Sequence, residues 1–410
     1  MSLKTAPAQL TAADAELRGQ YLREVLALLY PQCSTDDPGA PKVAEYLVIP
    51  DARRPKLLVP MGSRRVAVAA VRRFTEPQSR LAKLKRDAVV MALRSGTWPA
   101  LLRDRVRLSA GLGESGDSID DFLRETLGTE LSLSVHIGPA RANRKPVLQL
   151  LDPSGKTIGF AKLGTGPLTR RLVRAETAAL TALSHVKLTT VTVPSVLHAG
   201  QWRGHQVLVQ SPLPIWQPRE PLTSRRLVEA MLEVASACGT TQGWLATSPY
   251  WADLRSRLAQ LTDHEDGVAL DNAARRLVEH CSDLGLRYGA WHGDWAPWNM
   301  ANVADALLVW DWERFTTGVP LGFDALHHDL QKRLQTGVEP REAVEQTVRN
   351  AGGLLSHFSV VPDSAEITAL LYLVDLAARY LTDRQAESGA RLGVLGTWLL
   401  PVLVERVGRL

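Results

Sequence analysis

The sequence has few cysteines and no long apolar run. Only three of its 410 residues are cysteine, at positions 33, 238 and 281, and no two of them form a CxxC pair. A disulfide framework and a cysteine-based zinc site are therefore not expected. The N-terminus lacks the apolar core of a signal peptide, and the stretches 366–381 and 392–404 are too short or too interrupted to cross a bilayer. We expect a cytoplasmic protein without a membrane span.

Low-complexity tracts are also absent, and the composition is globular. Hydrophobic residues make up 45% of the chain and charged residues 22%, enough for a sizeable core in two or three domains. The net charge is +5, but residues 41–110 alone hold 16 Lys and Arg against 5 Asp and Glu. Such a segment suits a nucleic-acid or lipid surface, although a solvated helical face that attracts phosphate also explains it. We favour the solvated face and do not expect nucleic acid as a partner.

The first 125 residues differ from the rest of the chain in their predicted helices and strands. They show helical spacing at 9–31, two strands at 46–50 and 57–60 joined by a hairpin loop, and a basic helix at 77–95. A glycine-rich stretch then places a domain boundary between about 108 and 125. We interpret residues 1–125 as a basic α+β cap or accessory domain.

The rest of the chain divides into a β-rich lobe, 126–213, and a helical lobe, 214–410. The first lobe is predicted to contain one helix at 168–184 and strands at 131–137, 147–151, 157–163, 191–197 and 206–210. A proline-rich link at 212–221 follows. Beyond it the pattern is mostly helical, with one strand-like run at 306–310.

The motif richest in chemical groups lies in the helical lobe and reads Trp291-His-Gly-Asp-Trp-Ala-Pro-Trp-Asn299, followed by Val309-Trp-Asp-Trp-Glu313. Phosphoryl transfer to an alcohol needs a carboxylate to accept the hydroxyl proton, and oxygen ligands to hold magnesium against the phosphates. Asp294 and Asn299 are five residues apart, a spacing typical of one tight loop, and Asp311 follows twelve residues later after an apolar run. These hard oxygen donors suit magnesium rather than zinc.

This pattern, HGDxxxxN followed by Asp-Trp-Glu, resembles the aminoglycoside phosphotransferase and choline kinase group of the protein-kinase-like superfamily. The segment Gly318-Val-Pro-Leu-Gly-Phe-Asp324 is similar to the Gly-x-Pro…Asp segment of that family. The resemblance covers about residues 130–385 and implies a bilobal fold that uses ATP and Mg²⁺. A small molecule with a hydroxyl group, such as a sugar, an aminoglycoside or an amino alcohol, is the implied acceptor.

The resemblance also implies roles for individual residues. His292 supports the catalytic loop and Asp294 is the base. Asn299 and Asp311 bind magnesium, and Asp324 anchors the start of a helix.

The β-rich lobe should then supply groups for the nucleotide. Lys162 lies near the end of the third predicted strand of this lobe, and alternation puts Phe160 on the same face. Glu176 follows on the next helix, and the two charged residues resemble the kinase ion pair that orients the lysine toward the phosphates. A surface lysine and a surface glutamate are the structural alternative.

Two further nucleotide contacts are expected from backbone positions. The turn 137–145 could bind phosphate through amides between Gly138 and Asn143, although a basic hairpin turn explains the same residues. The segment 207–213 is the expected hinge that binds adenine. Its predicted contacts are Gln210, Ser211 and Leu213.

Aromatic and histidine residues crowd the catalytic motif. Five tryptophans lie between positions 291 and 312, and we expect most to be core, with Trp295 and Trp298 as candidates for substrate contact. His327, His328 and Asp329 look like a metal cluster, but adjacent helical histidines point different ways, so we expect a structural role.

We therefore predict an α+β, bilobal protein-kinase-like fold preceded by an additional α+β domain, and an ATP-dependent small-molecule kinase. A protein kinase fits less well because Asp-Trp-Glu replaces Asp-Phe-Gly and no activation segment is recognisable. The other alternative is a nucleotide-binding pseudokinase or scaffold that acts through its basic N-terminal domain. The sequence leaves the oligomeric state and the acceptor open.

Overall fold

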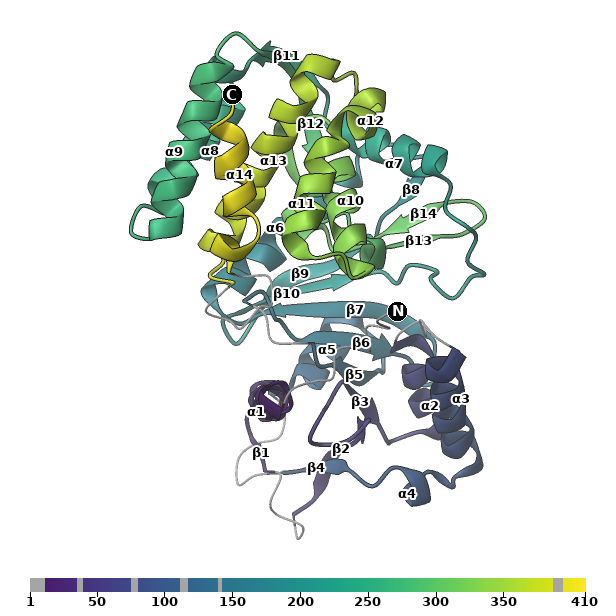
Figure 1. The fold of residues 1–410 in the computed structure, drawn as a ribbon. Coiled ribbons are helices and arrows are strands. Elements are labelled where there is room, and N and C mark those ends of the chain that lie inside the picture. The colour runs from purple at the N-terminus through teal and green to yellow at the C-terminus, as the bar shows by residue number, and fades with distance from the viewer. Residues whose placement is uncertain (1–11, 35–39, 75–79, 111–116, 139–141, 386–393) are drawn as a thin grey trace, which may run out of the picture. The chain divides into compact units, whose positions relative to one another are not determined.

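The computed structural model describes residues 12–34, 40–74, 80–110, 117–138, 142–385 and 394–410 (Figure 1). Their contacts divide the chain into two compact units. The β-rich unit comprises the described residues up to 138, together with 144–174 and 195–212. The helical unit comprises 142–143, 175–194 and the described residues from 213 onward. The α+β class predicted from the sequence is confirmed.

The β-rich unit is built on a nine-stranded sheet in the order β1-β4-β2-β3-β5-β6-β7-β10-β9. Its strands are β1 (Cys33–Ser34), β2 (Lys42–Ile49), β3 (Leu57–Pro60), β4 (Arg105–Ala110), β5 (Ser132–His136), β6 (Val147–Leu151), β7 (Thr157–Gly164), β9 (Val196–Trp202) and β10 (His205–Gln210). Its helices are α1 (Ala12–Leu29), α2 (Arg64–Phe74), α3 (Arg80–Ser95), α4 (Trp98–Leu101) and α5 (Ile119–Leu127). Helix α6 (Pro167–Leu183) is divided between the units after Arg174.

Strand alternation gives this sheet two apolar faces. In β3, Leu58 packs in the core formed with α1 and α5, whereas Leu57 and Val59 pack against α2 and α3. The first core continues through β5, β6, β7 and β10, so α1 shares one apolar core with strands on both sides of residue 125.

The pairing of β3 with β5 also carries the sheet across the predicted boundary at 108–125. That stretch includes the end of strand β4 and most of helix α5, two elements that the sequence interpretation missed. The side chain of Ser118 caps α5 by accepting a hydrogen bond from the Asp121 N–H, and Gly128 ends the helix with a left-handed φ of 62°. The three-part division of the chain stays a prediction.

The helical unit contains two small sheets among its helices. Its helices are α7 (Ser224–Ser236), α8 (Pro249–Ala259), α9 (Glu265–His280), α10 (Phe323–Gln335), α11 (Pro340–Arg349), α12 (Ala351–Leu355), α13 (Pro362–Thr382) and α14 (Leu400–Val407). Its strands are β8 (Val191–Thr192), β11 (Thr241–Trp244), β12 (Gly285–Trp291), β13 (Met300–Asn302), β14 (Leu307–Val309) and β15 (Thr316–Pro320). They form the sheets β11-β12-β15 and β13-β14-β8. The prediction of a single strand after residue 214 is therefore wrong.

Helix α13 forms the centre of the helical unit, surrounded by α8, α9, α10, α11 and α14 (Figure 1). It is apolar on nearly all sides, as expected for a helix buried within a core. In the described part of the chain, no helix has the length and apolarity needed to cross a membrane.

Candidate active site

The predicted catalytic loop leaves the end of β12 through a glycine that no other residue can replace without strain. Gly293 has a left-handed φ of +81°, and a Cβ there would lie 2.3 Å from the Arg314 carbonyl oxygen. The glycine therefore lets the chain turn tightly against the segment after β14. Asp294 follows this turn directly.

Asp324, in the first turn of α10, fixes the backbone of this loop. Its Oδ2 accepts a hydrogen bond from the His292 N–H at 2.7 Å, and its Oδ1 accepts one from the Gly293 N–H at 3.1 Å. Burial raises the pKa of this carboxyl to about 7 against the opposing effect of the two N–H donors. The sequence interpretation expected Asp324 to anchor a helix start; the residue lies in the first turn of α10, and its carboxylate holds the loop.

His292 is fully buried beneath the loop and bonds to both sides of it. Its Nδ1 accepts a hydrogen bond from the Asp294 N–H at 3.1 Å, so Nε2 carries the proton and donates to the Trp310 carbonyl at 3.1 Å. Its ring lies edge-on to Trp312, with 4.5 Å between ring centroids. Burial lowers the pKa of His292 to about 4, which keeps the ring neutral and preserves this arrangement.

Asp294 and Asn299 are joined within one turn, as their spacing predicted. The turn ends in a short 3₁₀ helix, Pro297–Asn299. The Asn299 Nδ2 donates to the Asp294 carbonyl and to Asp294 Oδ2, both at 2.9 Å. Since the amide nitrogen faces Asp294, the Asn299 carbonyl oxygen is the atom left to bind a metal.

The other oxygen of Asp294 contacts a residue from outside the motif. His327 Nε2, on α10, lies 3.1 Å from Asp294 Oδ1. Burial acts to raise the pKa of Asp294, but the hydrogen bond from His327 and the nearby Arg379 hold it well below the usual range. The carboxyl group is therefore ionised and able to accept a proton.

Asp311 leaves the β13–β14 hairpin at the same end as Asn299. The two strands are antiparallel with Met300 opposite Val309, and the Trp310 N–H donates to the Asn299 carbonyl at 3.0 Å. Asp311 itself has a left-handed φ of 72°, an uncommon conformation for a residue other than glycine. Such conformations gather at functional sites, where surrounding contacts hold them.

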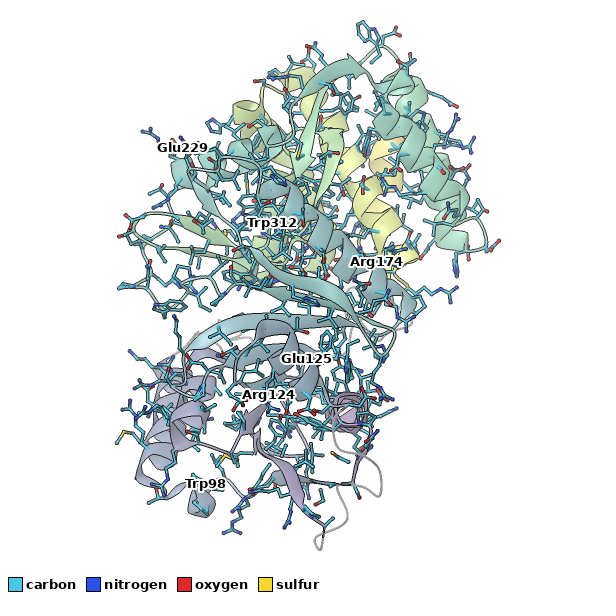
Figure 2. The ribbon with its side chains drawn as sticks, turned by 180° about the vertical axis from the view of Figure 1, so that it is seen from behind. Trp98, Arg124, Glu125, Arg174, Glu229 and Trp312 are labelled. Atoms are coloured by element: carbon cyan, nitrogen blue, oxygen red, sulfur yellow. The ribbon has the colours of Figure 1, made fainter. Side chains whose placement is uncertain are left out.

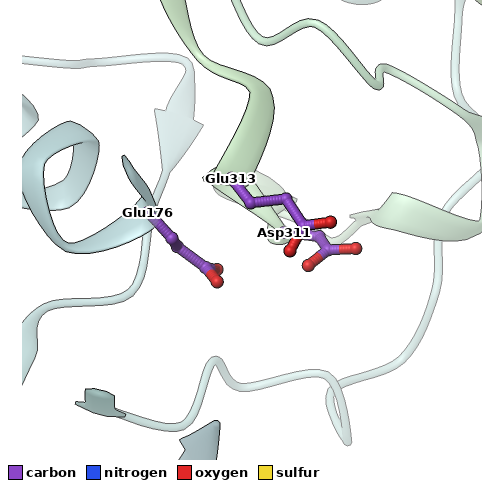
Figure 3. A group of neighbouring side chains, drawn as sticks. All are labelled: Glu176, Asp311 and Glu313. Carbon is purple, nitrogen blue, oxygen red and sulfur yellow. The ribbon is translucent and has the colours of Figure 1, made fainter. Parts of the chain in front are cut away.

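Two glutamates lie beside Asp311 and form an acidic group with it (Figure 3). Ligand oxygens of Glu176, Asp311 and Glu313 all lie within 4.8 Å of one another. Glu176 reaches this group from α6, and Glu313 from the 3₁₀ turn after Asp311 (Figure 3). The Asn143 Nδ2 donates to Glu313 Oε1 at 3.1 Å.

The donor set fits a magnesium ion. Carboxylate and amide oxygens are the ligands that this hard cation prefers, and those of Asn299, Asp311 and Glu313 are all of this kind. Sequence reasoning missed Glu313 as a candidate ligand, although an acidic residue two positions after Asp311 was a signal. The Asn143 side-chain amide donates to Glu313, and binding of phosphate by the backbone amides of this turn stays a prediction.

Lys162 belongs to the β-rich unit, and its predicted pairing with Glu176 stays a prediction. It lies on β7 and is buried. Its neighbours Ala161 and Leu163 pack in the core with α1, so alternation turns Lys162 and Phe160 to the opposite face, as predicted.

The remaining predicted nucleotide contacts stay predictions. Gln210 ends β10 and is buried. The Ser211 N–H donates to the Ser195 carbonyl at 2.8 Å. The Leu213 side chain packs against the β13–β14 hairpin. Gly138 has open space around it, and residues 139–141 of the predicted phosphate loop lie outside the described residues.

Most of the tryptophans near the motif are core residues. Trp295 and Trp312 are almost completely buried (Trp312 is labelled in Figure 2), so the expectation that Trp295 is available to a substrate is wrong. Trp298 is 39% exposed and stays a candidate for substrate contact. Asp329, next to His327 and His328 in the sequence, pairs with Arg333 on the same helix.

Several solved structures that resemble this chain are small-molecule phosphotransferases. The motifs of the sequence resemble the same group. A thermostable aminoglycoside phosphotransferase mutant in a ternary complex with ADP and hygromycin B matches at 15% identity and a TM-score of 0.46, over 71% of this chain and 98% of its own. A choline kinase from Streptococcus pneumoniae matches at 14% identity and a TM-score of 0.46, over 71% and 99%. Spectinomycin phosphotransferase in complex with ADP and spectinomycin matches at 11% identity and a TM-score of 0.40, over 71% and 98%. No family model and no curated protein sequence matches the chain.

Proposed function

We propose that this chain transfers the γ-phosphate of ATP to a hydroxyl group of a small molecule, with Mg²⁺ as its metal. The observation that carries the proposal is the Asp294 carboxylate, whose two oxygens and backbone are all held by hydrogen bonds, in the same unit as a group of acidic oxygens that could hold a metal ion. Phosphoryl transfer depends mainly on positioning and electrostatic stabilisation, which such a rigid site provides.

Each residue then has a defined role. Asp294 orients the acceptor hydroxyl and takes its proton as the oxygen bonds to phosphorus and ADP leaves. His292 and Asp324 hold the loop in place. Asn299, Asp311 and Glu313 would hold Mg²⁺, which when bound neutralises charge on the phosphate oxygens. Lys162 is proposed to bind the phosphates, and Glu176 to orient either Lys162 or the metal site.

The test is an assay of ADP release with ATP and Mg²⁺ and a panel of acceptors. Hygromycin B, spectinomycin and choline are suitable first acceptors, together with simple sugars, and mass spectrometry would confirm a phosphorylated product. Asp294→Asn should lower turnover by about 10²–10⁴-fold, the usual contribution of a general base. Asp305→Asn is the matched control, since it changes an exposed aspartate in the same region of the chain.

The metal is tested in the same assay. Chelation by EDTA should abolish turnover, and Glu313→Gln should raise the Mg²⁺ concentration needed for half-maximal rate because one anionic ligand is lost. Full activity of Asp294→Asn would refute the proposal. Nucleotide binding without any phosphorylated product would favour the pseudokinase alternative.

A further inference from the structure

We propose that His327 is a positioning residue that fixes the carboxylate of Asp294 through a directed hydrogen-bond chain from Tyr372 to His327 to Asp294. The inference rests on the proposed role of Asp294 as the base. It adds two residues that lie outside the sequence motif, each from a different helix of the core.

The three side chains form a continuous chain within the helical unit. His327 Nε2 lies 3.1 Å from Asp294 Oδ1, and His327 Nδ1 lies 3.0 Å from the Tyr372 hydroxyl. His327 comes from α10 and Tyr372 from α13, and both side chains are fully buried. Both ring nitrogens of a buried imidazole therefore have a partner, as buried polar groups require.

The direction of the chain follows from the chemistry of its end. An ionised carboxylate only accepts hydrogen bonds, so His327 Nε2 must carry the hydrogen. In the neutral ring Nδ1 is then an acceptor, and the Tyr372 hydroxyl donates to it. Burial lowers the pKa of His327 and raises that of Tyr372, which keeps the ring neutral and the hydroxyl protonated.

This hydrogen-bond chain completes the support of the Asp294 carboxylate. Asn299 holds Oδ2 and His327 holds Oδ1, so rotation about the Cβ–Cγ bond would break both hydrogen bonds. Each oxygen keeps a second lone pair for the proton of the acceptor. Without His327, Asn299 is the one described residue that still hydrogen-bonds the carboxylate, and the group can turn away from the direction needed to accept that proton.

A purely structural role for His327 predicts a different set of mutant properties. If the imidazole only filled space, leucine would replace it well, because the two side chains are similar in size. If it acts as a donor to Asp294, the activity of a variant depends on where its donor atom lies. Glutamine can place its amide nitrogen near the position of Nε2, whereas asparagine reaches only to the position of Nδ1.

The test compares His327→Gln, His327→Asn and His327→Leu in the phosphotransfer assay. The acceptor is whichever of hygromycin B, spectinomycin or choline gives turnover, or water in MgATP hydrolysis if none does. We expect the asparagine and leucine variants to lose about 10–100-fold in kcat, the effect of a misplaced reacting group, with little change in the KM for ATP. The glutamine variant should recover most of that loss. Equal activity of the leucine and glutamine variants, or kcat values that follow the thermal-unfolding midpoints, would overturn the proposal.

A second measurement separates this proposal from the proposed function. In protein labelled with ¹⁵N-histidine, the two ring nitrogens of His327 should show the neutral Nε2–H form by NMR, with assignment from His327→Gln. Tyr372→Phe should shift the Nδ1 resonance because its donor is removed. An Nδ1–H or doubly protonated ring at neutral pH would overturn the hydrogen-bond chain even in an active enzyme. If the ring has the expected form but the protein transfers no phosphate, the hydrogen-bond chain is present and the proposed function has failed.

Discussion

Replacing Gly293 with alanine tests whether close packing of the catalytic loop, and not only its backbone conformation, fixes the position of Asp294. Gly293 has a φ of +81°, and an added Cβ would lie 2.3 Å from the Arg314 carbonyl oxygen. Gly318 offers a matched control. Its φ is +75°, but an added Cβ would have no atom within 4 Å.

The two substitutions share one cost and differ in another. A left-handed conformation costs an L-residue about 1–2 kcal/mol, and this applies equally to Gly293→Ala and Gly318→Ala. At position 293 the obstacle is backbone, so Arg314 must move as a unit with its neighbours. Overpacking of this kind costs about 1–3 kcal/mol more. We therefore expect Gly293→Ala to destabilise by roughly 2–5 kcal/mol and Gly318→Ala by roughly 1–2 kcal/mol.

Urea unfolding followed by tryptophan fluorescence measures the stabilities, and the phosphotransfer assay measures kcat at a temperature where both variants are folded. Gly293→Ala should lose most of its turnover because the neighbouring Asp294 is displaced, whereas Gly318→Ala should keep it. Equal destabilisation by the two variants would refute the packing argument. Full activity of Gly293→Ala would show that the loop tolerates a shift of its backbone.

Two further predictions concern the loop and the N-terminal segment. His292 has a pKa of about 4 in the folded protein, below the usual 6.5, so its neutral form stabilises above pH 6.5 and this contribution is lost as the pH falls toward 4. The stability difference between the wild type and His292→Gln, at most on the order of 3 kcal/mol, should therefore shrink from pH 7.5 to pH 4.5 in urea titrations, and a constant difference would contradict the assignment. Deleting residues 1–116 removes α1, which buries Tyr21, Val25 and Leu29 among others at about 1.5–3 kcal/mol each. The shortened chain should lack a cooperative unfolding transition of the β-rich unit by circular dichroism, and a stable truncated protein would show that the rest of this unit folds without residues 1–116.

Strands and helices with a strong local pattern could be predicted from the sequence. The strand predicted at 147–151 is β6 as found, and the helix predicted at 168–184 is α6 within one residue at each end. The missed strand β4 reads Arg-Val-Arg-Leu-Ser-Ala, and its arginines on exposed positions hide its strand character. Helix α5 did carry local signals, Ser118 as its cap and Gly128 at its end, that could have identified it.

The contacts of the candidate site also fall into those that local sequence predicts and those that it does not. Asp294 and Asn299 meet because they share one short turn, and a short-range spacing is visible in the sequence. Glu176 and Asp311 are far apart in the chain, and their proximity depends on how α6 and the β14 loop pack, which spacing cannot give. His327 was noticed only as part of an apparent metal cluster. Its contact with Asp294 depends on the rotation of α10, which tertiary packing sets.

The polar groups of the catalytic loop explain why so much of the site lies outside the motif. The Gly293 N–H is held by Asp324, and the Gly293 carbonyl accepts a hydrogen bond from Arg379 on α13. The Asp294 carboxylate is held by His327, which in turn bonds to Tyr372. All four partners come from α10 and α13, two helices of the same apolar core. A buried polar group without a partner is costly, so a loop rich in such groups can keep this conformation only where rigid helices supply the partners. The motif therefore contains the proposed reacting groups, and the core of the helical unit fixes their geometry.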